Sequence, residues 1–419
     1  MKRSASALLL AALVAMLCAC GLSPAVPVQT PLPEAEGLRV AVASDLHFDP
    51  ENTDKHADLG AAAYNPQLAE ALLYDAQTQG AKMLLLTGDI VNAGKQEYHD
   101  GLIEKLRAAE DAGLQIYVLP GNHDLSPVTQ REFAALYADF GFAEACSRDA
   151  SSLSYCVMGD DLCLLMLDTA GYDAEAMDLP DAPRRDDDEA FLSEATLQWV
   201  REMLESAKAQ NLPVLCAGHF NILTAEGRDP GRTGLYLENG KGLAALLREY
   251  SVPLYVSGHL HTRLVLQEQG LTELVTEYLL AYPTGYSMLD FTADAITYVP
   301  RRVDVEGWAE AAHYNSRTLK HFSRWQQKQL RDYAYQNVSD MSKRNPLTRR
   351  EAAQAVDFFY AAMNAYWRGD LAGEREALLA MPGYEPFFRC AKGYAYEWWL
   401  RDLIENATPM LGGFRLERP

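Results

Sequence analysis

Short apolar runs alternate with amphipathic segments along most of the chain. Five runs are rich in Leu, Val or Ile and are bounded by turn-forming residues, which is typical of buried strands. Segments with helical periodicity lie between them, and this alternation predicts an α/β domain. The five runs are LRVAVAS (38–44), AKMLLLT (81–87), LQIYVLP (114–120), LPVLCA (212–217) and VPLYVS (252–257).

Further strand-like runs lie between and after these five. They occupy residues 152–157, 162–168 and much of 262–303, and they predict hairpins that complete two stacked sheets. The α/β domain is therefore predicted to span residues 38–304.

The chain changes character at about Glu306, where the strand pattern ends and helical periodicity takes over. One helix is predicted to begin at the capping-box pair Thr348 and Glu351 and to end before Gly369. An all-α helical domain is thus predicted over residues 305–419. Its tryptophans are predicted to form the aromatic core of a helical bundle; they are Trp308, Trp325, Trp367, Trp398 and Trp399.

The first residues have the pattern of an export signal. Two basic residues precede an apolar run at 7–17, and LCACG (17–21) resembles a bacterial lipobox. The apolar run is shorter than the roughly 20 residues that span a bilayer. We therefore expect a signal peptide over 1–19, a lipid on Cys20 and a Pro-rich tether over 20–37. Such a protein is exported and anchored to the outer face of the bacterial cell membrane.

Charge narrows the range of partners. The chain has 58 acidic and 37 basic residues, a net charge of −21. Up to Asp304 there are 44 acidic and 21 basic residues, so the α/β part carries −23 and the remainder +2. A surface this acidic repels nucleic-acid polymers. A small anionic substrate needs a local positive charge, such as a metal ion.

Cysteines indicate no covalent framework. Beyond Cys20 the number is odd and no CxxC spacing occurs, so buried free thiols are expected. The residues are Cys146, Cys156, Cys163, Cys216 and Cys390.

Each of the five strand-like runs leads into residue types that bind metals. The sequences that follow are DLH (45–47), GDIVN (88–92), GNHD (121–124), GHF (218–220) and GHLH (258–261). In open α/β sheets ligands bind beyond the carboxyl ends of the strands, so these side chains are expected at one site. Alternate residues of an extended chain project to the same side, so Asp45 and His47 can share a metal. The motif glycines each precede a polar residue where the chain turns sharply out of a strand, and a Cβ is costly there; they are Gly88, Gly121, Gly218 and Gly258.

This ordered set of motifs resembles the calcineurin-like metallophosphoesterase family, over roughly residues 38–303. The resemblance implies a four-layer αββα sandwich and two divalent metal ions. It implies that Asp89 bridges the metals, that one of them is bound by Asp45, His47 and His261, and that the other is bound by Asn122, His219 and His259. Carboxylates, imidazoles and an amide oxygen suit Mn²⁺, Fe, Zn²⁺ or Mg²⁺. Asn92 stands where purple acid phosphatases have a tyrosine ligand, so that branch is disfavoured.

Two further residues are candidates for catalysis. His123, beside Asn122, is placed to donate a hydrogen bond to the phosphoryl group or a proton to the leaving oxygen. Asp124 is expected to orient that imidazole; the alternative is a turn residue that satisfies backbone amides. Arg228, Arg232 and Tyr236 are possible substrate contacts, whereas His99 is given no role.

Three functions are compatible with the sequence. Two metals can lower the pKa of a bridging water and hold phosphate oxygens during in-line attack, so hydrolysis of a phosphoester is expected. The leading hypothesis is a phosphodiesterase acting on a small phosphodiester such as a cyclic nucleotide, and the complete ligand set supports it. The layout also resembles secreted phosphodiesterases with a helical bundle after the catalytic domain. The alternatives are a phosphomonoesterase or nucleotidase, and a surface lipoprotein that binds a partner without catalysis.

Overall fold

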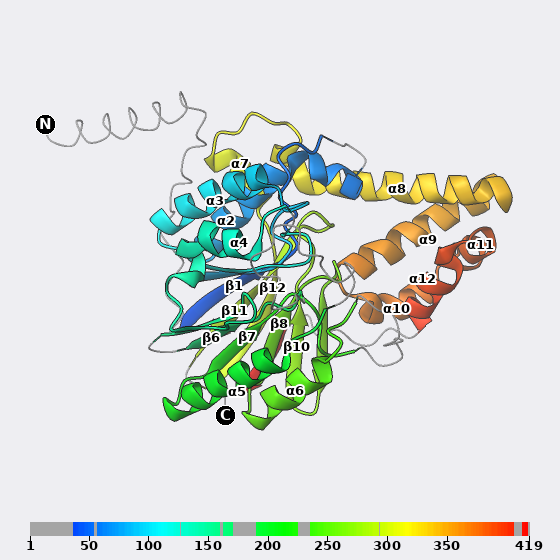
Figure 1. The fold of residues 1–419 in the computed structure, drawn as a ribbon. Helices are drawn as coiled ribbons and strands as arrows, with labels where there is room; N and C mark the ends of the chain where they lie inside the picture. The colour runs from blue at the N-terminus through cyan, green and yellow to red at the C-terminus, as the bar shows by residue number, and fades with distance from the viewer. Residues whose placement is uncertain are drawn as a thin grey trace, which may run out of the picture.

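Two mixed β-sheets, packed face to face, form the centre of the computed structural model (Figure 1). The structure describes residues 37–53, 57–125, 127–159, 162–170, 190–224, 235–292, 294–405 and 413–417. The predicted signal peptide, and all of the predicted tether except Gly37, lie outside these residues.

The first sheet has the strand order β13-β12-β11-β1-β2-β3. Three of its strands are parallel neighbours and carry the first three motifs: β1 (Leu38–Ala43), β2 (Met83–Thr87) and β3 (Gln115–Leu119). All five residues of β2 are buried, as expected for a strand covered on both faces. The antiparallel strands are β11 (Gly285–Phe291), β12 (Ala295–Arg302) and β13 (Phe414–Glu417).

The second sheet has the order β4-β5-β6-β7-β8-β10-β9. Strands β7 (Val214–Ala217) and β8 (Leu254–Ser257) carry the last two motifs and are parallel. Four of the remaining strands form the hairpins that the sequence predicts, and they are β5 (Tyr155–Met158), β6 (Cys163–Met166), β9 (Leu264–Glu268) and β10 (Leu271–Val275). The short strand β4 (Ser147–Arg148), which pairs with β5, was not predicted.

Helices cover the outer face of each sheet (Figure 1). Over the first sheet lie α2 (Asn65–Thr78), α3 (Gln96–Asp111), α4 (Gln130–Leu136) and α7 (Val305–Ala311). Over the second lie α5 (Glu194–Ala209) and α6 (Gly240–Glu249). Of two short helical segments, η1 (Ala57–Tyr64) contacts α2, and η2 (Ala138–Phe142) contacts one strand of each sheet. Buried residues of both sheets, such as Val40 and Leu215, share one hydrophobic cluster between them. The predicted four-layer αββα sandwich is confirmed.

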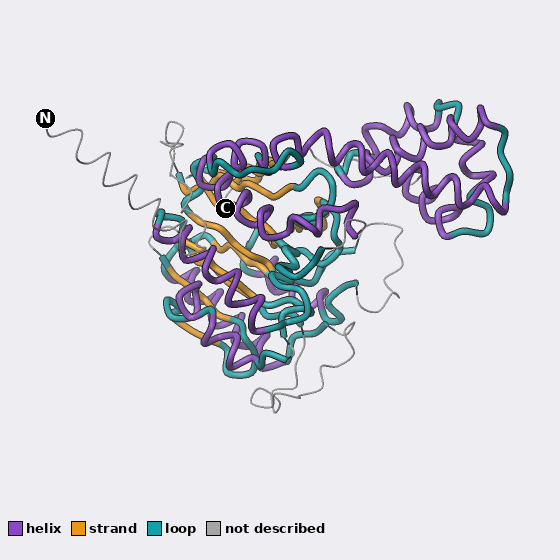
Figure 2. The backbone as a smooth tube through the Cα atoms, turned by 90° about the horizontal axis from the view of Figure 1, so that it is seen from above, coloured by secondary structure: helices purple, strands orange, loops and turns teal. Residues whose placement is uncertain are grey.

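A helical region follows the sandwich and projects from one side of it (Figure 2). It contains η4 (Leu319–His321), α8 (Phe322–Arg344), α9 (Arg349–Trp367), α10 (Leu371–Leu379), α11 (Tyr384–Cys390) and α12 (Ala395–Glu405). The capping box at Thr348 and Glu351 starts α9 as predicted. Helix α8 belongs to both parts, since Phe322 lies in the sandwich core while Leu330 and Ala334 lie in the core of the helical region.

The end of the chain corrects the prediction of an all-helical segment over 305–419. Residues 414–417 form β13, which pairs antiparallel with β12 at the edge of the first sheet. The aromatic ring of Phe414 lies 5.0 Å from that of Tyr298, so the strand is held by packing as well as by hydrogen bonds.

Two expectations about side chains also need correction. Trp308 is fully buried in the sandwich core rather than in the bundle, because α7 packs on the first sheet, and Trp398 is 58% exposed. Cys146 is exposed, whereas the other four described cysteines are buried free thiols as predicted. Among the described residues, the structure has no helix that combines the length and the apolar character needed to cross a bilayer.

Candidate metal centre

The loops that follow five strands meet at one edge of the two sheets. Backbone hydrogen bonds join the first two loops, from Asp45 N to Gly88 O (3.0 Å) and from His47 N to Asp89 O (2.9 Å). The two sheets are joined here as well, since His259 N donates to Asp45 Oδ2 over 2.9 Å. The predicted convergence of the motifs therefore exists in the structure.

Left-handed backbone conformations bring the side chains inward. Positive φ angles are uncommon for residues other than glycine and cost about 1–3 kcal/mol each, so they persist only where the surrounding structure enforces them. Five of the seven predicted ligands have such angles: Asp45 (52°), His47 (41°), Asp89 (48°), His259 (67°) and His261 (54°).

Two motif glycines are required by close packing rather than by their own φ angles. A Cβ on Gly121 would lie 2.3 Å from Asp89 Oδ1, and a Cβ on Gly258 would lie 1.8 Å from Ser44 Oγ and 2.5 Å from Asp45 Oδ2. Real Cβ atoms do not approach so closely. The glycines therefore leave room for the ligand carboxylates, which is a more specific reason than a sharp turn.

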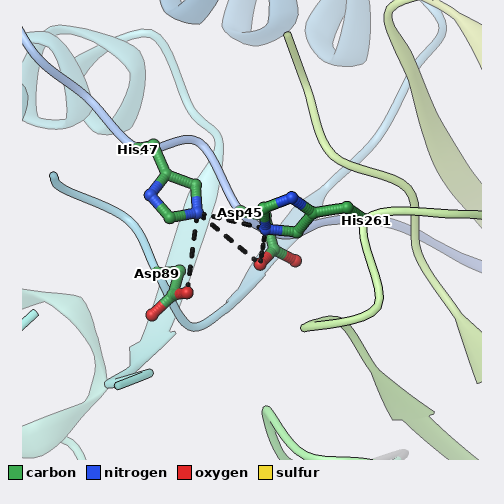
Figure 3. A group of neighbouring side chains, drawn as sticks. All are labelled: Asp45, His47, Asp89 and His261. Carbon is green, nitrogen blue, oxygen red and sulfur yellow. Dashed lines mark hydrogen bonds and ion pairs between the residues drawn. The ribbon is translucent and has the colours of Figure 1, made fainter. Parts of the chain in front are cut away.

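Four side chains form the first group, which Figure 3 shows: Asp45, His47, Asp89 and His261. The Nε2 atom of His47 lies 3.5 Å from Asp89 Oδ2 and 3.3 Å from His261 Nε2. His261 Nε2 in turn lies 3.3 Å from Asp45 Oδ1. Ligand atoms from three separate loops thus face one point.

The second group shares Asp89 with the first and adds His219 and His259. His219 Nε2 lies 3.3 Å from Asp89 Oδ2 and 3.1 Å from the Oδ1 atom of Asn122. The other ring nitrogen of His219 lies 2.9 Å from Thr87 O, which fixes the orientation of the ring. The position of Asp89 in both groups is the one that a bridging carboxylate needs.

Burial and charge oppose each other in these side chains. Burial raises the pKa of Asp45, but the neighbouring His261 and His219 outweigh it and lower the pKa to about 2. Burial also raises the pKa of Asp89, and again the imidazoles of His219 and His47 hold it well below its ordinary value. For His219, burial lowers the pKa while Asp89 and Asp45 raise it to about 9. Both carboxylates are therefore ionised.

The cluster fits a pair of divalent metal ions. Asp45 Oδ1 is buried and makes no well-formed hydrogen bond; its neighbour is His261 Nε2 at 3.3 Å, itself a candidate ligand, and a cation between the two would compensate the buried carboxylate. The donor atoms are carboxylate oxygens and imidazole nitrogens, with the amide oxygen of Asn122 beside them. This set suits first-row divalent metals and Mg²⁺.

The two candidate catalytic residues differ in their surroundings. His123 is exposed, its backbone N donates to Asp89 Oδ1 over 2.8 Å, and its ring meets that of His47 edge to face at 4.8 Å. It therefore stands at the mouth of the cluster, where a substrate can reach it.

The contacts of Asp124 correct the expectation that it orients His123. This side chain is fully buried, and its oxygens accept hydrogen bonds from Gly121 N (2.7 Å) and Val91 N (2.8 Å). Burial and the nearby Asp89 raise its pKa to about 7. Asp124 thus corresponds to the alternative, a turn residue that holds backbone amides, and it ties the second motif loop to the third.

Three supporting residues escaped the sequence analysis. The side chain of Asn65 donates to the carbonyls of Leu46 and His47 (2.9 Å each) and accepts from Asp49 N (3.2 Å), so it holds the first motif loop. The ring of Tyr278 stacks on His261 at 4.4 Å. His99 is buried and contacts Asp124 O over 2.9 Å. Each stands far in sequence from the loop it supports, so no motif reveals it.

The structure describes one of the three suggested substrate contacts. Tyr236 is half-buried and forms a β-bridge with Asn221, two residues after His219. Arg228 and Arg232 lie outside the described residues.

Comparison with known proteins bears on both parts of the chain. Residues 38–263 match a family model described as calcineurin-like phosphoesterase, and residues 304–408 match one described as the C-terminal domain of cyclic nucleotide phosphodiesterase. No curated protein matches the chain.

Several solved structures are similar to this chain. A dimetal phosphatase from Danio rerio is 13% identical, with a TM-score of 0.49 over 64% of this chain and 97% of that one. A purple acid phosphatase from yellow lupin is 15% identical, with a TM-score of 0.41 over 65% and 53%. A putative 5'-nucleotidase from Staphylococcus aureus is 13% identical, with a TM-score of 0.40 over 61% and 51%.

The first family model spans more than half of the chain and includes every loop that supplies the Asp/His cluster. The chain belongs to the calcineurin-like phosphoesterase family, as a dimetal phosphoesterase.

Proposed function

We propose that this phosphoesterase hydrolyses a small phosphodiester, with a cyclic nucleotide as the first candidate. The observation that carries the proposal is the match of residues 304–408 to the C-terminal domain of cyclic nucleotide phosphodiesterase, directly after a phosphoesterase domain. The metal centre by itself suits a monoester as well as a diester, because its residues address the phosphorus and not the second ester group.

The chain's own residues divide the work at the site. Asp45, His47 and His261 would hold one metal, Asn122, His219 and His259 the other, and Asp89 both. When bound, such a pair supplies positive charge for the phosphate oxygens and lowers the pKa of water. The buried hydrogen bonds behind these ligands keep them in place, which reduces the reorganisation that binding requires.

His123 is proposed as the proton donor. As the bond between phosphorus and the leaving oxygen breaks, an imidazole N–H can give its proton to that oxygen, so that an alcohol leaves instead of an alkoxide. Its exposure and its contact with the ring of His47 support this role.

The size of the substrate follows from charge. With a net charge of −21, the chain repels long polyanions, whereas a small diester carries a single negative charge. We therefore infer a small-molecule substrate and no nucleic-acid polymer.

The site of action is proposed from the first residues. The basic start, the apolar run at 7–17 and the LCACG sequence support export and a lipid on Cys20, followed by a Pro-rich tether. The enzyme would then meet its substrate outside the cell membrane.

The test compares a model diester with a model monoester. Purified protein is stripped of metal, reloaded with Mn²⁺, and assayed on bis-(p-nitrophenyl) phosphate and on p-nitrophenyl phosphate, with metal-free protein as the control. Preference for the diester supports the proposal and leads to cyclic nucleotides as the next substrates. Preference for the monoester supports a phosphatase or nucleotidase. No turnover of either, with both metals bound, supports a binding protein.

A further inference from the structure

A buried carboxylate lies behind the loops of the second metal group. Glu273, in the middle of β10, has no exposed surface, and it is the only charged residue of the strand; the others are apolar or hydroxylated. Burial raises the pKa of this side chain to about 7, while hydrogen bonds from Ser257, Leu223, Asn221 and Ile222 oppose that shift. Burying a carboxyl group costs free energy unless it is hydrogen-bonded, so the hydrogen-bond partners of Glu273 indicate its role.

The partners of Glu273 belong to two different loops. Its Oε2 accepts from Leu223 N (2.6 Å) and Ile222 N (3.1 Å), and its Oε1 accepts from the side chain of Asn221 (2.9 Å). All three donors lie in the loop that begins with His219. Oε1 also accepts from the hydroxyl of Ser257 (2.7 Å), which ends β8 two residues before His259.

A hydrogen bond also joins the two loops directly to each other. The side chain of Asn221 donates to Ser257 Oγ over 2.8 Å as well as to Glu273, so three polar groups form a triangle. Every group that faces the carboxylate is a donor. Only an acceptor at both oxygen positions satisfies them all, and this is a property of a carboxylate and not of an amide.

We propose that Glu273 is a positioning residue that fixes His219 and His259 relative to each other and thereby sets the affinity of the second metal site. The two histidines reach the site from adjacent strands, and their loops share Glu273 as a common anchor. Glu273 anchors the loops of both histidines of the second group, whereas in the first group only His261 lies on one of these loops. The first group also has separate supports, namely Asn65 behind His47 and Tyr278 against His261. A defect at Glu273 therefore reaches one site more than the other.

The experiment measures Mn²⁺ binding alone, without substrate. The purified full chain is stripped of metal and titrated with Mn²⁺ by calorimetry, as wild type, Glu273→Gln and Ser257→Ala. Glu273→Gln is expected to weaken one of two sites by about 10–100-fold, the usual effect of losing an outer-shell partner, and to leave the other unchanged. Ser257→Ala removes a single donor and is expected to produce a smaller loss at the same site, and it remains informative if Glu273→Gln does not fold.

Leu271→Ala is the matched control. Leu271 lies two residues earlier on the same face of β10, is fully buried, and packs in the core beneath α5 and α6. This variant destabilises the same strand but removes none of the hydrogen bonds between Glu273 and the two loops, so both Mn²⁺ affinities should equal those of the wild type. The melting temperature of each variant shows how far stability has changed.

The identity of the weakened site comes from a double variant. His261→Ala removes a ligand of the first group, and Glu273→Gln combined with it should leave no site of wild-type affinity. A double variant that keeps one intact site would overturn the proposal, since both changes would then act on the same site. The proposal is also overturned if Glu273→Gln only lowers the melting temperature, as Leu271→Ala does, with both affinities intact.

The inference rests on the dimetal centre of the proposed function but not on its substrate. A wild-type chain that binds two Mn²⁺ ions yet prefers a monoester would contradict the proposed substrate and leave the role of Glu273 standing. A wild-type chain without two Mn²⁺ sites would overturn both.

Discussion

At the scale of single residues, the metal centre depends on side chains that hold an unfavourable backbone in place. Asp45 and His47 both have positive φ angles, and Asn65 binds the carbonyls between and after them. Asp and His tolerate this conformation better than β-branched residues do. The ligand residues are thus restricted twice, by the chemistry of the metal and by the conformation of the loop.

The clearest prediction at this scale concerns His123. Replacing it with alanine should reduce turnover by ~10²–10⁴-fold, the usual contribution of a general acid, because the proton donor is lost. Both metals should remain, since the ring of His123 lies outside the two ligand groups. Elemental analysis and kcat on bis-(p-nitrophenyl) phosphate check this, with the exposed His321→Ala as the control. Unchanged turnover would remove His123 from the mechanism.

A second residue-scale prediction concerns the pH dependence of stability. Burial raises the pKa of Asp75, on α2, to about 6, with Asp304 acting in the same direction. The folded state therefore binds a proton more tightly than the unfolded state does, so this contribution to stability is complete below about pH 4 and is lost as the pH rises through 6. A shift of this size corresponds to about 2–3 kcal/mol.

The variant Asp75→Asn should remove that part of the pH dependence. Calorimetric melting at pH 4.5, 6 and 7.5 checks it, and the quantity to compare is the slope of melting temperature against pH in the two proteins. Parallel slopes would show that Asp75 titrates alike in the folded and unfolded states.

The same scale shows what sequence reasoning can and cannot reach. The convergence of the motif side chains was predictable because each motif directly follows a recognisable strand, so position along the chain gives position in space. The assignment of individual ligands to two metals rested on the resemblance to the family. The partners of Asp124 could not be predicted, because an acid at this position fits both a catalytic GNHD motif and a simple turn. Only the fold shows that Val91 N and Gly121 N donate hydrogen bonds to it. Glu273 was hidden for a similar reason, because a polar residue in LTELV reads as solvent-facing until a second loop is found to cover it.

At the scale of elements, the strand pattern predicted the sandwich better than it predicted the edge of its first sheet. Strands β1, β2, β3, β7 and β8 all lie within the five predicted runs. Strand β13 was missed because FRLE is only four residues long and follows a series of helices, so nothing local marks it. Its existence depends on β12, which offers it a free edge.

Strand β13 should be important for the integrity of that edge. Phe414 is 8% exposed and packs on Tyr298, so Phe414→Ala should lower the free energy of unfolding by about 3 kcal/mol. Arg415→Ala, on the exposed side of the same strand, should change it little. Chemical unfolding of the three proteins compares them, and equal stabilities would mean that β13 contributes no packing.

At the scale of the whole molecule, the helical region and the sandwich are joined at more than one place. The side chain of Gln326 on α8 donates to Thr284 Oγ1 over 2.6 Å, and Tyr282 lies in the core of the helical region. The guanidinium of Arg263, two residues after His261, donates to Arg368 O at the end of α9. The region therefore contacts segments that are continuous with the metal loops.

A further prediction at this scale concerns the attachment of the protein to the membrane. Cys20→Ala should prevent lipid attachment, so that the protein moves from the membrane fraction to the soluble fraction or stays uncleaved. Fractionation with metabolic labelling by a fatty acid checks this, and Cys18→Ala serves as the control because Cys18 lies in the predicted signal peptide. Equal labelling of wild type and Cys20→Ala would contradict the lipobox interpretation.

The pairing of β13 with β12 has a consequence for how the protein is made. Tyr298 and its partner Phe414 are 116 positions apart, so a ribosome must add the whole helical region before the edge of the first sheet can close. Until then β12 is an unpaired edge on a nascent chain, a known starting point for aggregation. The helical segment between β12 and β13 is thus attached to the first sheet at both of its ends, because the strands before and after it pair with each other.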